Sequence, residues 1–500
     1  MSDSIFIGLD TDGKNQELLL HRANRHGLIA GATGTGKTVT MQIMAEGFSN
    51  AGVPVFMVDV KGDVSGLSQT GKSSDKLHDK LISRAEKIGL DNYAYKAFPT
   101  IFWDLFGEKG HPVRTTITEM GPTLLTRLMD LTNAQEGILN IAFQVAEDNE
   151  WPLLDLKDLK ATLQFIAAQR KELSLQYGNI TSQSTSAVIR ELLVLQRDGA
   201  NDFFGEPALK LSDLMRSDMS GNGIISILAA DDLINHPRMY ATFLLWLLSE
   251  LFEELPEIGD PDKPVMVFFF DEAHLLFDGA PKALVQKIEQ VARLIRSKGV
   301  GLYFVTQNPS DIPDSVLSQV GNRIQHALRA YTPKEMKAVK SSAQAFRPNP
   351  AFKTEDVISD LGVGEALVSL MDTKGRPQIV GRTLIRPPSS RLGPATDAER
   401  KTVMSRSPVK GDYDESIDRK SAYEVLMAKR KTVLAAQEKE KAAKEKAKKK
   451  PARRGRKRQS ALEAGTKAAV RSLGASIGRK IAGKHGAAIM RGILGSMMRR

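Results

Sequence analysis

The 500-residue sequence predicts an α/β protein, in which helices cover a mostly parallel β-sheet, a helical insertion interrupts the sheet, and a basic low-complexity tail follows. Apolar runs of strand length alternate with helical patterns at both ends of the core, as in parallel sheets covered by helices. Residues 116–215 show helical periodicity without a strand pattern, and the last seventy residues are strongly basic. The composition, 41% hydrophobic and 26% charged, excludes a fibrous or wholly disordered protein.

Five apolar runs are the clearest strands, and the carboxyl ends of such strands are where an open α/β sheet places its ligands. They are His26–Ala30, Val53–Asp59, Gly223–Leu228, Val265–Asp271 and Val300–Thr306. Four helices are predicted in the insertion, the first with a proline near its start, which favours the first helical turn. They are Pro122–Leu131, Ala134–Asp148, Leu156–Glu172 and Thr181–Gln196.

The chain is predicted to divide into two domains and a tail, because composition shifts sharply after the last strand pattern. In chain order, the segments are a discontinuous core (1–115 and 216–385), the insertion (116–215), a wrapping segment or linker with a short helix over Ser416–Lys431 (386–430), a basic low-complexity linker (431–460) and a cationic, Gly-rich amphipathic helix (461–500).

The sequence contains no cysteine, which excludes disulfides and fits a reducing compartment. Four acidic residues lie within the first twenty, so this segment does not have the pattern of a secretory signal. No window reaches the ~18 uncharged apolar residues that a membrane span requires. We therefore expect a cytoplasmic protein.

The net charge of +11 is concentrated in the tail. Residues 431–500 contain 21 Lys or Arg and four Glu, a net charge of +17, which leaves residues 1–430 at −6. The sequence pI of 9.4 therefore gives no reason to expect nucleic-acid binding over the general surface of the core.

A phosphate-binding loop follows the first predicted strand. The segment matches the pattern G-x-x-x-x-G-K-[ST] in full, and a helical pattern comes directly after it. Glycines let backbone amides turn toward phosphate oxygens, the lysine reaches the β- and γ-phosphates, and the last hydroxyl is a ligand for Mg²⁺. We expect ATP and Mg²⁺ to bind at Gly31, Ala32, Thr33, Gly34, Thr35, Gly36, Lys37 and Thr38.

Two adjacent carboxylates, Asp271 and Glu272, end the most apolar strand. The first is placed to hold a water on Mg²⁺, and the second to polarise the water that attacks the γ-phosphate. An acidic pair that merely begins a helix is the alternative, and the phosphate-binding loop makes it the weaker one. Because a site that only binds nucleotide does not need the second acid, the pair predicts hydrolysis.

Gln307 follows the strand Val300–Thr306, and its amide is a candidate sensor of the γ-phosphate. If the protein forms a ring, an arginine finger is expected from the neighbouring subunit. Arg323 and Arg25 are the candidates, with Arg329 as a further one, and each could instead be an ordinary surface cation.

These motifs together resemble the HerA/FtsK branch of P-loop ATPases over residues 20–430. The resemblance is carried by GATGTGKT, VFMVDVKGD about twenty residues later, FFFDEAH, and the strand before Gln307. The segments HPVRTT (His111–Thr116), EMGP (Glu119–Pro122) and SPVKGDYD near residue 407 resemble more specifically the bacterial YjgR group of HerA-like proteins.

The resemblance implies a RecA-like P-loop NTPase core that assembles as a homo-hexameric ring and couples ATP hydrolysis to movement along double-stranded DNA. It implies Lys37 and Thr38 as nucleotide and Mg²⁺ residues, Asp271 as the acid on the metal side, and Glu272 as the catalytic acid. Gln307 would be the sensor, while Asp59 ends a strand where the branch often has an aspartate of unassigned role.

Two departures from the resembling families concern partners. HerA proteins usually carry an N-terminal β-barrel that docks a nuclease, but about 25 residues precede the loop strand here, so a nuclease partner is not expected. FtsK-type motors carry membrane spans and a DNA-reading winged helix, and neither pattern is visible. The leading hypothesis is a DNA translocase or helicase, and the alternatives are a protein-remodelling or membrane-associated ATPase and a nucleotide-gated oligomeric scaffold.

The tail leaves two questions open. Residues 431–460 are suited either to DNA phosphates or to a solvated spacer. Further on, small residues recur every four positions beside an apolar stripe, a pattern typical of close helix packing or of contact with an anionic membrane surface. They are Gly474, Gly478, Ala482 and Gly486.

Overall fold

A computed structural model describes residues 3–278, 280 and 282–448. In this part of the chain, strands form a 12-stranded sheet in the order β2-β1-β12-β11-β10-β3-β9-β8-β4-β7-β5-β6. The eight strands from β10 to β6 run parallel, whereas the other four join by antiparallel pairing. The strands are β1 (Ser4–Asp10), β2 (Asn15–Leu19), β3 (Gly27–Ala30), β4 (Val55–Asp59), β5 (Thr100–Asp104), β6 (His111–Pro112), β7 (Ile225–Ala229), β8 (Met266–Phe270), β9 (Val300–Thr306), β10 (Asn322–Gln325), β11 (Glu365–Ser369) and β12 (Gly381–Ile385).

The chain forms two compact units, which we call the sheet unit (residues 1–115 and 198–417) and the helical unit (116–197 and 418–500). The helices of the sheet unit are α1 (Lys37–Asn50), α2 (His78–Lys87), α8 (Asn201–Phe203), α9 (Leu211–Leu214), α10 (Pro237–Glu254), α11 (Lys282–Leu294), α12 (Asp314–Leu317), α13 (Pro333–Gln344), α14 (Thr354–Asp360) and α15 (Asp397–Ser405). Those of the helical unit are α3 (Ile117–Leu128), α4 (Asn133–Asp148), α5 (Leu156–Ala168), α6 (Arg170–Tyr177), α7 (Ser182–Leu195) and α16 (Ala422–Lys448).

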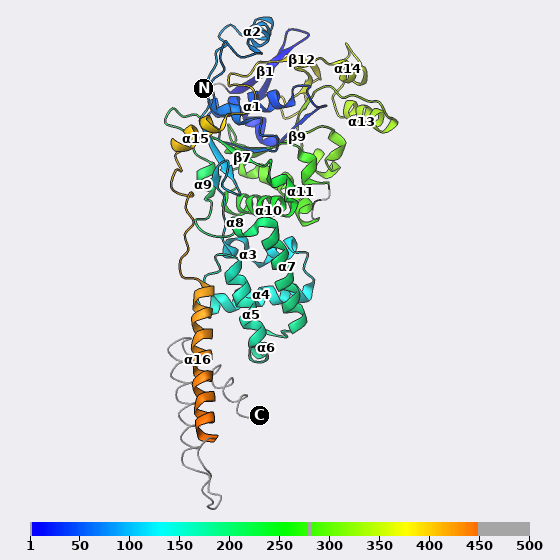
Figure 1. The fold of residues 1–500 in the computed structure, drawn as a ribbon. Helices are drawn as coiled ribbons and strands as arrows, with labels where there is room; N and C mark the ends of the chain where they lie inside the picture. Colours follow the sequence, from blue (N-terminus) through cyan, green and yellow to red (C-terminus); the bar gives the residue numbers. More distant parts are fainter. Residues whose placement is uncertain (1–2, 279, 281, 449–500) are drawn as a thin grey trace, which may run out of the picture. The chain divides into compact units, whose positions relative to one another are not determined.

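Alternating side chains of the central strands pack into layers on the two faces of the sheet. Met57 of β4 belongs to one buried cluster with Phe48 of α1, whereas its neighbour Phe56 places its ring 6.3 Å from that of Phe243 in α10. Figure 1 shows α1 and α10 on opposite sides of the strands. Because both faces are covered, the strands are apolar throughout, which explains why β3, β4, β7, β8 and β9 were the ones that the sequence predicted.

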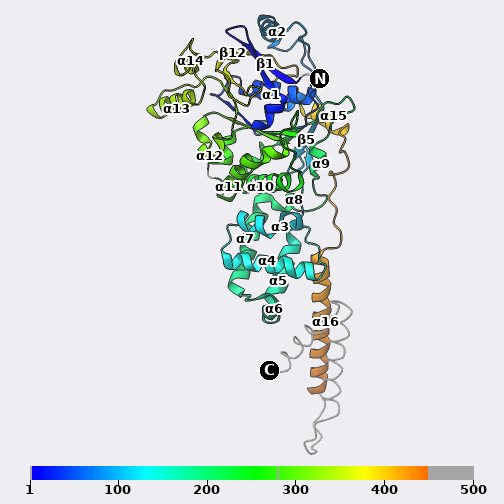
Figure 2. The same cartoon turned by 180° about the vertical axis from the view of Figure 1, so that it is seen from behind.

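The helical unit packs α3, α4, α5 and α7 together, and the start of α16 contacts α5 (Figure 2). Ser421 donates to the buried Asp158 of α5, and the backbone N–H of Tyr423 donates to the same carboxylate at 2.8 Å. Lys429 of α16 lies 4.3 Å above the ring of Trp151. The start of α16 is therefore fastened to this unit by hydrogen bonds and by a cation–π contact.

Predicted and observed helices differ in several places. The helix predicted over Leu156–Glu172 ends as α5 at Ala168 and continues as the separate α6. The helix predicted over Ser416–Lys431 begins at Ala422 and runs to Lys448, because the predicted basic linker begins with an Ala-, Glu- and Lys-rich stretch of high helix propensity. Helix α15 was not predicted. Residues 198–215, placed by the sequence in the insertion, belong to the sheet unit.

The wrapping segment has a definite course in the sheet unit. Residues 386–396, which we call the strap, lie against α1 and against the turn that follows β4. Glu46 of α1 is fully buried and accepts hydrogen bonds from the backbone N–H groups of Ser389 and Ser390 at 3.0 and 2.8 Å. Arg386 completes the pair at 3.1 Å. The predicted helix over 461–500 lies outside the described residues. None of the helices described has both the length and the apolar character needed to cross a membrane.

Candidate nucleotide-hydrolysis site

The phosphate-binding loop joins β3 to α1, at the carboxyl end of the parallel strands. Lys37 is buried, and its Nζ donates to the backbone oxygen of Gly31 at 2.7 Å, inside the curve of the loop. Gly36 has φ 116°, a backbone conformation that residues with a Cβ rarely adopt. Burial, followed by the charge of Lys61, lowers the pKa of Lys37. A second ammonium group therefore lies within electrostatic reach of this lysine.

His326 packs against the phosphate-binding loop and the start of α1, and it was not predicted as a site residue from the sequence. Its Nε2 lies 2.8 Å from the Thr40 hydroxyl and its Nδ1 lies 2.9 Å from the Glu365 oxygen. A Cβ at Gly31 would stand 2.5 Å from the His326 Cβ, so only glycine fits there. Burial lowers the pKa of His326 to about 4 and keeps the imidazole neutral beside a site meant for anions.

The acidic pair follows β8, two strands away from β3. Val58 of β4 pairs with Phe270, which places Asp59 beside Asp271 at the ends of neighbouring strands. Burial and then the Glu272 carboxylate raise the pKa of Asp271 to about 6. Burial acts in the same direction on Glu272, but the ammonium of Lys61 outweighs it, and the pKa of Glu272 is lowered. Glu272 is thus the more readily ionised member.

Gln307 connects the acidic pair to the phosphate-binding loop. It follows β9, whose Thr306 pairs with Ala30 at the end of β3. The Gln307 Nε2 lies 3.4 Å from both oxygens of Glu272, and its Oε1 accepts a hydrogen bond from the Thr33 hydroxyl, also at 3.4 Å. These bonds are long, so the side chain is placed between the two elements without being locked to either.

The turn after β4 contributes two residues that sequence reasoning missed, Lys61 and Asp63. The Lys61 Nζ contacts the Glu272 carboxylate, and the Asp63 Oδ2 accepts a hydrogen bond from the Thr38 hydroxyl at 3.3 Å. Both belong to the segment VFMVDVKGD, in which only Asp59 was singled out. Their charge and their place just past a strand end were the available signals.

The arginine-finger candidates lie at different ends of the strands. Arg25 precedes β3 and pairs with Asp260 at 2.8 Å, and Arg323 pairs in register with Leu28 and donates to the Leu317 oxygen at 2.9 Å. Both are therefore toward the amino ends, away from the loop of their own subunit. Arg329 is exposed and follows the carboxyl end of β10.

The donor set fits Mg²⁺ and a nucleotide phosphate. The Asp63 Oδ1 is buried without a hydrogen-bond partner, next to the Thr38 hydroxyl, and hydroxyl and carboxylate oxygens are the ligands that Mg²⁺ prefers. The described residues contain no cluster of three acidic or histidine side chains that would form a complete metal cage by itself. Phosphate oxygens and waters would supply the remaining ligands, as in other P-loop sites.

The chain is similar to known proteins along most of its length. The protein named DNA double-strand break repair helicase HerA from Pyrococcus furiosus is 23% identical over 375 residues, which cover 69% of this chain and 63% of that protein. Its namesake from Saccharolobus solfataricus is 23% identical over 359 residues, which cover 71% and 64%. The alignments thus span less than two thirds of these relatives.

Among solved structures, the plasmid coupling protein TrwB bound to a GTP analogue is similar, with a TM-score of 0.49 and 13% identity over 80% of this chain and 92% of that one. The family described as Helicase HerA-like C-terminal matches residues 5–500. A match of this extent, on a chain with a complete phosphate-binding loop and acidic pair, shows that the protein belongs to the HerA-like helicase C-terminal family.

Proposed function

We propose that this protein is an ATPase motor that binds ATP with Mg²⁺ and uses its hydrolysis to move along double-stranded DNA. The ATPase part of the proposal rests on two contacts of Gln307. Its side chain lies between Thr33 of the phosphate-binding loop and Glu272 of the acidic pair, and so connects the two. The names of the relatives, which are DNA double-strand break repair helicases, support the DNA half.

Each residue at the carboxyl end of the sheet has a distinct role in this proposal. Lys37 and the backbone amides at the start of α1 bind phosphate oxygens. The oxygens of Thr38, Asp63 and Asp271 would hold Mg²⁺, directly or through water, and its charge offsets that of the phosphates. Glu272 accepts the proton of the attacking water, and Gln307 orients that water.

Assembly and location extend the same proposal. A homo-hexameric ring would place Arg25, Arg323 or Arg329 against the site of a neighbouring subunit, where an arginine stabilises the charge of the transition state. Membership of the YjgR group, a cytoplasmic location, the lack of a nuclease partner, and contact of the tail with a membrane surface stay predictions from the sequence.

The test is steady-state ATP turnover of the full-length protein with and without linear duplex DNA, at low and moderate salt. We expect duplex DNA to stimulate turnover several-fold, and Lys37→Ala and Glu272→Gln to abolish both the basal and the stimulated rate. Glu254→Gln, at an exposed position of α10, is the matched control.

Other outcomes would separate the parts of the proposal. Turnover that is abolished in both variants but indifferent to DNA would overturn the DNA substrate, and would favour a protein-remodelling or membrane-associated ATPase. Nucleotide binding that changes the oligomer without appreciable turnover would favour the nucleotide-gated scaffold. Equal rates in wild type and Lys37→Ala would overturn the ATPase itself.

A further inference from the structure

Both oxygens of the Glu272 carboxylate are occupied by other side chains. The Lys61 Nζ contacts Oε1, the His274 Nδ1 lies 3.2 Å from Oε2 without hydrogen-bond geometry, and the Gln307 Nε2 lies 3.4 Å from each oxygen. The side chain of Glu272 is only 5% exposed. A carboxylate that is to accept a proton from water must offer a lone pair to that water. A carboxylate has about four lone-pair sites, so these three contacts do not exhaust it. The Lys61 ammonium is the closest of them, and its departure would free Oε1 for the attacking water.

The backbone of Glu272 shows that this arrangement is imposed by its surroundings. Its φ and ψ are 46° and 48°, in the left-handed region, where a residue with a Cβ is strained. Strain of this kind persists when the contacts around a residue hold it in place, and it is concentrated at sites that change during function. The contacts of the carboxylate are the observed restraint.

Lys61 is the partner best suited to leave. Its side chain is 41% exposed and has a long flexible stem, whereas Gln307 is shorter and also lies within reach of Thr33 in the phosphate-binding loop, at 3.4 Å. The turn that carries Lys61 also contacts the phosphate-binding loop, because the Asp63 Oδ2 accepts a hydrogen bond from the Thr38 hydroxyl at 3.3 Å. Phosphate oxygens bound by that loop would therefore compete with Glu272 for the Lys61 ammonium. Lys61 thus has one permanent anionic partner, Glu272, and would have a second one, the phosphates, when ATP is bound.

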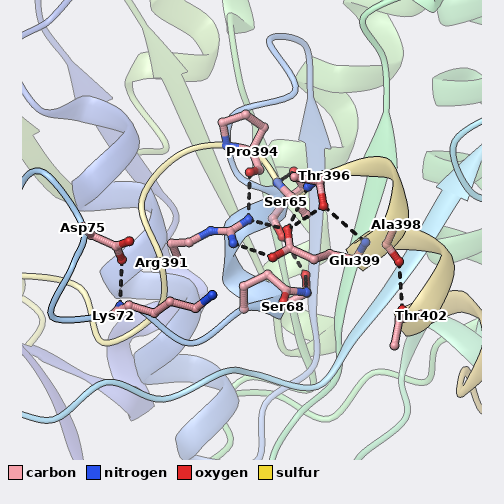
Figure 3. Close-up of polar contacts among 12 residues, drawn as sticks. Ser65, Ser68, Lys72, Asp75, Arg391, Pro394, Thr396, Ala398, Glu399 and Thr402 are labelled. Carbon is pink, nitrogen blue, oxygen red and sulfur yellow. Dashed lines mark hydrogen bonds and ion pairs between the residues drawn. The ribbon is translucent and has the colours of Figure 1, made fainter.

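The strap contacts the segment that follows Lys61, around Ser65 (Figure 3). The Ala395 N–H donates to the Ser65 hydroxyl oxygen at 2.9 Å, and a Cβ at Gly66 would lie 2.3 Å from two strap oxygens. Arg391 donates to both oxygens of Glu399 at 2.7 Å, which ties the strap to the first turn of α15. The turn itself is held by Asp59, which accepts hydrogen bonds from the backbone N–H groups of Gly62 at 2.8 Å and Val64 at 3.3 Å. Release of Glu272 therefore requires only rotation of the Lys61 side chain.

From these contacts we infer that Lys61 is a positioning residue, which restrains Glu272 and gives it up when the phosphates of ATP compete for the ammonium. The inference rests on the proposed role of Glu272 in hydrolysis. It assigns to the family's second-strand motif a regulatory task, to keep turnover low until the substrate is fully bound.

The experiment compares Lys61→Met, Lys61→Arg and the control Lys72→Met, an exposed lysine of the same connection, in the full-length protein without DNA. Lys61→Met should raise basal ATP turnover several-fold, because the carboxylate is no longer restrained. Lys61→Arg should stay near the wild-type rate, since a guanidinium keeps the ion pair. A fall of Lys61→Met to the level of Glu272→Gln would overturn the restraint and make Lys61 an aid to catalysis.

A second readout does not depend on activity. In a double-mutant cycle of thermal unfolding, with Lys61→Met and Glu272→Gln alone and together, the effect of the lysine substitution should largely vanish in the Glu272→Gln background. Additive shifts in Tm would overturn the contact itself. If wild type hydrolyses no more ATP than Lys37→Ala, the proposed function fails, while the cycle still reports whether Lys61 and Glu272 are coupled.

Discussion

At the scale of single residues, Asp59 is a buried carboxyl group whose ionisation the surrounding site disfavours. Its oxygens accept backbone hydrogen bonds from Gly62 at 2.8 Å and Val64 at 3.3 Å, yet burial, followed by the charges of Asp63 and Asp271, raises its pKa to about 7. Because this pKa lies above the ordinary value of 3.8, the stability that protonated Asp59 contributes is complete below pH 4 and is lost as pH rises through 7.

Replacing Asp59 by asparagine should remove this dependence. We expect the Tm of wild type to fall relative to that of Asp59→Asn as pH rises from 6 to 8.5, because ionised Asp59 is unfavourable in the folded state. Differential scanning fluorimetry in EDTA measures both proteins side by side. Parallel curves for the two proteins would contradict the raised pKa.

The same scale shows what the sequence could and could not predict. Lys37, Thr38 and the acidic pair were predicted because their patterns are local, within eight residues or at one strand end. Lys61 and Asp63 belong to the site only because β4 and β8 are neighbours in the sheet, and a single sequence does not state that adjacency. His326 reaches the loop from 286 residues beyond Thr40, for the same reason.

At the scale of elements, the strap is attached to α1 through the buried carboxylate of Glu46, so replacing Glu46 tests how much this attachment stabilises the fold. Glu46 is fully buried, and all its partners come from the strap. Glu46→Ala would remove the carboxylate partner of Arg386, which keeps only backbone acceptors, and would leave two backbone N–H groups without their acceptor. It should cost about 3–5 kcal/mol of unfolding free energy. Urea unfolding measures this loss, and Asp79→Ala on the exposed face of α2 is the control. A loss below about 1 kcal/mol, the value of an ordinary hydrogen bond, would mean that the strap is loosely attached.

The sequence did not reveal β1 and β12, which belong to the antiparallel part of the sheet. Gly8 of β1 pairs with Ile385 of β12, 377 residues away, and these short strands alternate buried and partly exposed positions. The parallel strands β3, β4, β7, β8 and β9 were visible because burial on both faces makes them apolar throughout. The length of α16 was underestimated because low complexity was interpreted as a solvated linker, although its Ala-, Glu- and Lys-rich sequence favours helix.

At the scale of the whole molecule, a ring would let two inactive variants restore each other. A subunit with Lys37→Ala keeps its arginines, and a subunit with a finger substitution keeps its phosphate-binding loop. In a randomly mixed ring with heterologous contacts, about a quarter of the interfaces would combine an intact loop with an intact finger. Mixing Lys37→Ala with Arg323→Ala, Arg25→Ala or Arg329→Ala should recover ATP turnover only for the residue that acts in trans. No recovery in any mixture would contradict a finger supplied by these three arginines.

The end of the chain is the most basic part of the sequence, and its contribution to DNA binding is a prediction for the whole molecule. Residues 449–500 carry fifteen Lys or Arg and one Glu, and truncation after Lys448 keeps α16, the start of which contacts α5. If the tail lies along duplex DNA, truncation should weaken binding and flatten the plot of log K against log salt by about 0.9 for each phosphate that the tail neutralises. Fluorescence anisotropy with labelled duplex DNA at about 50–200 mM salt measures this slope, and basal ATP turnover should be unchanged. Equal slopes would mean that the tail does not bind DNA.

Co-sedimentation of both forms with anionic vesicles then tests the membrane alternative, which equal pelleting would exclude.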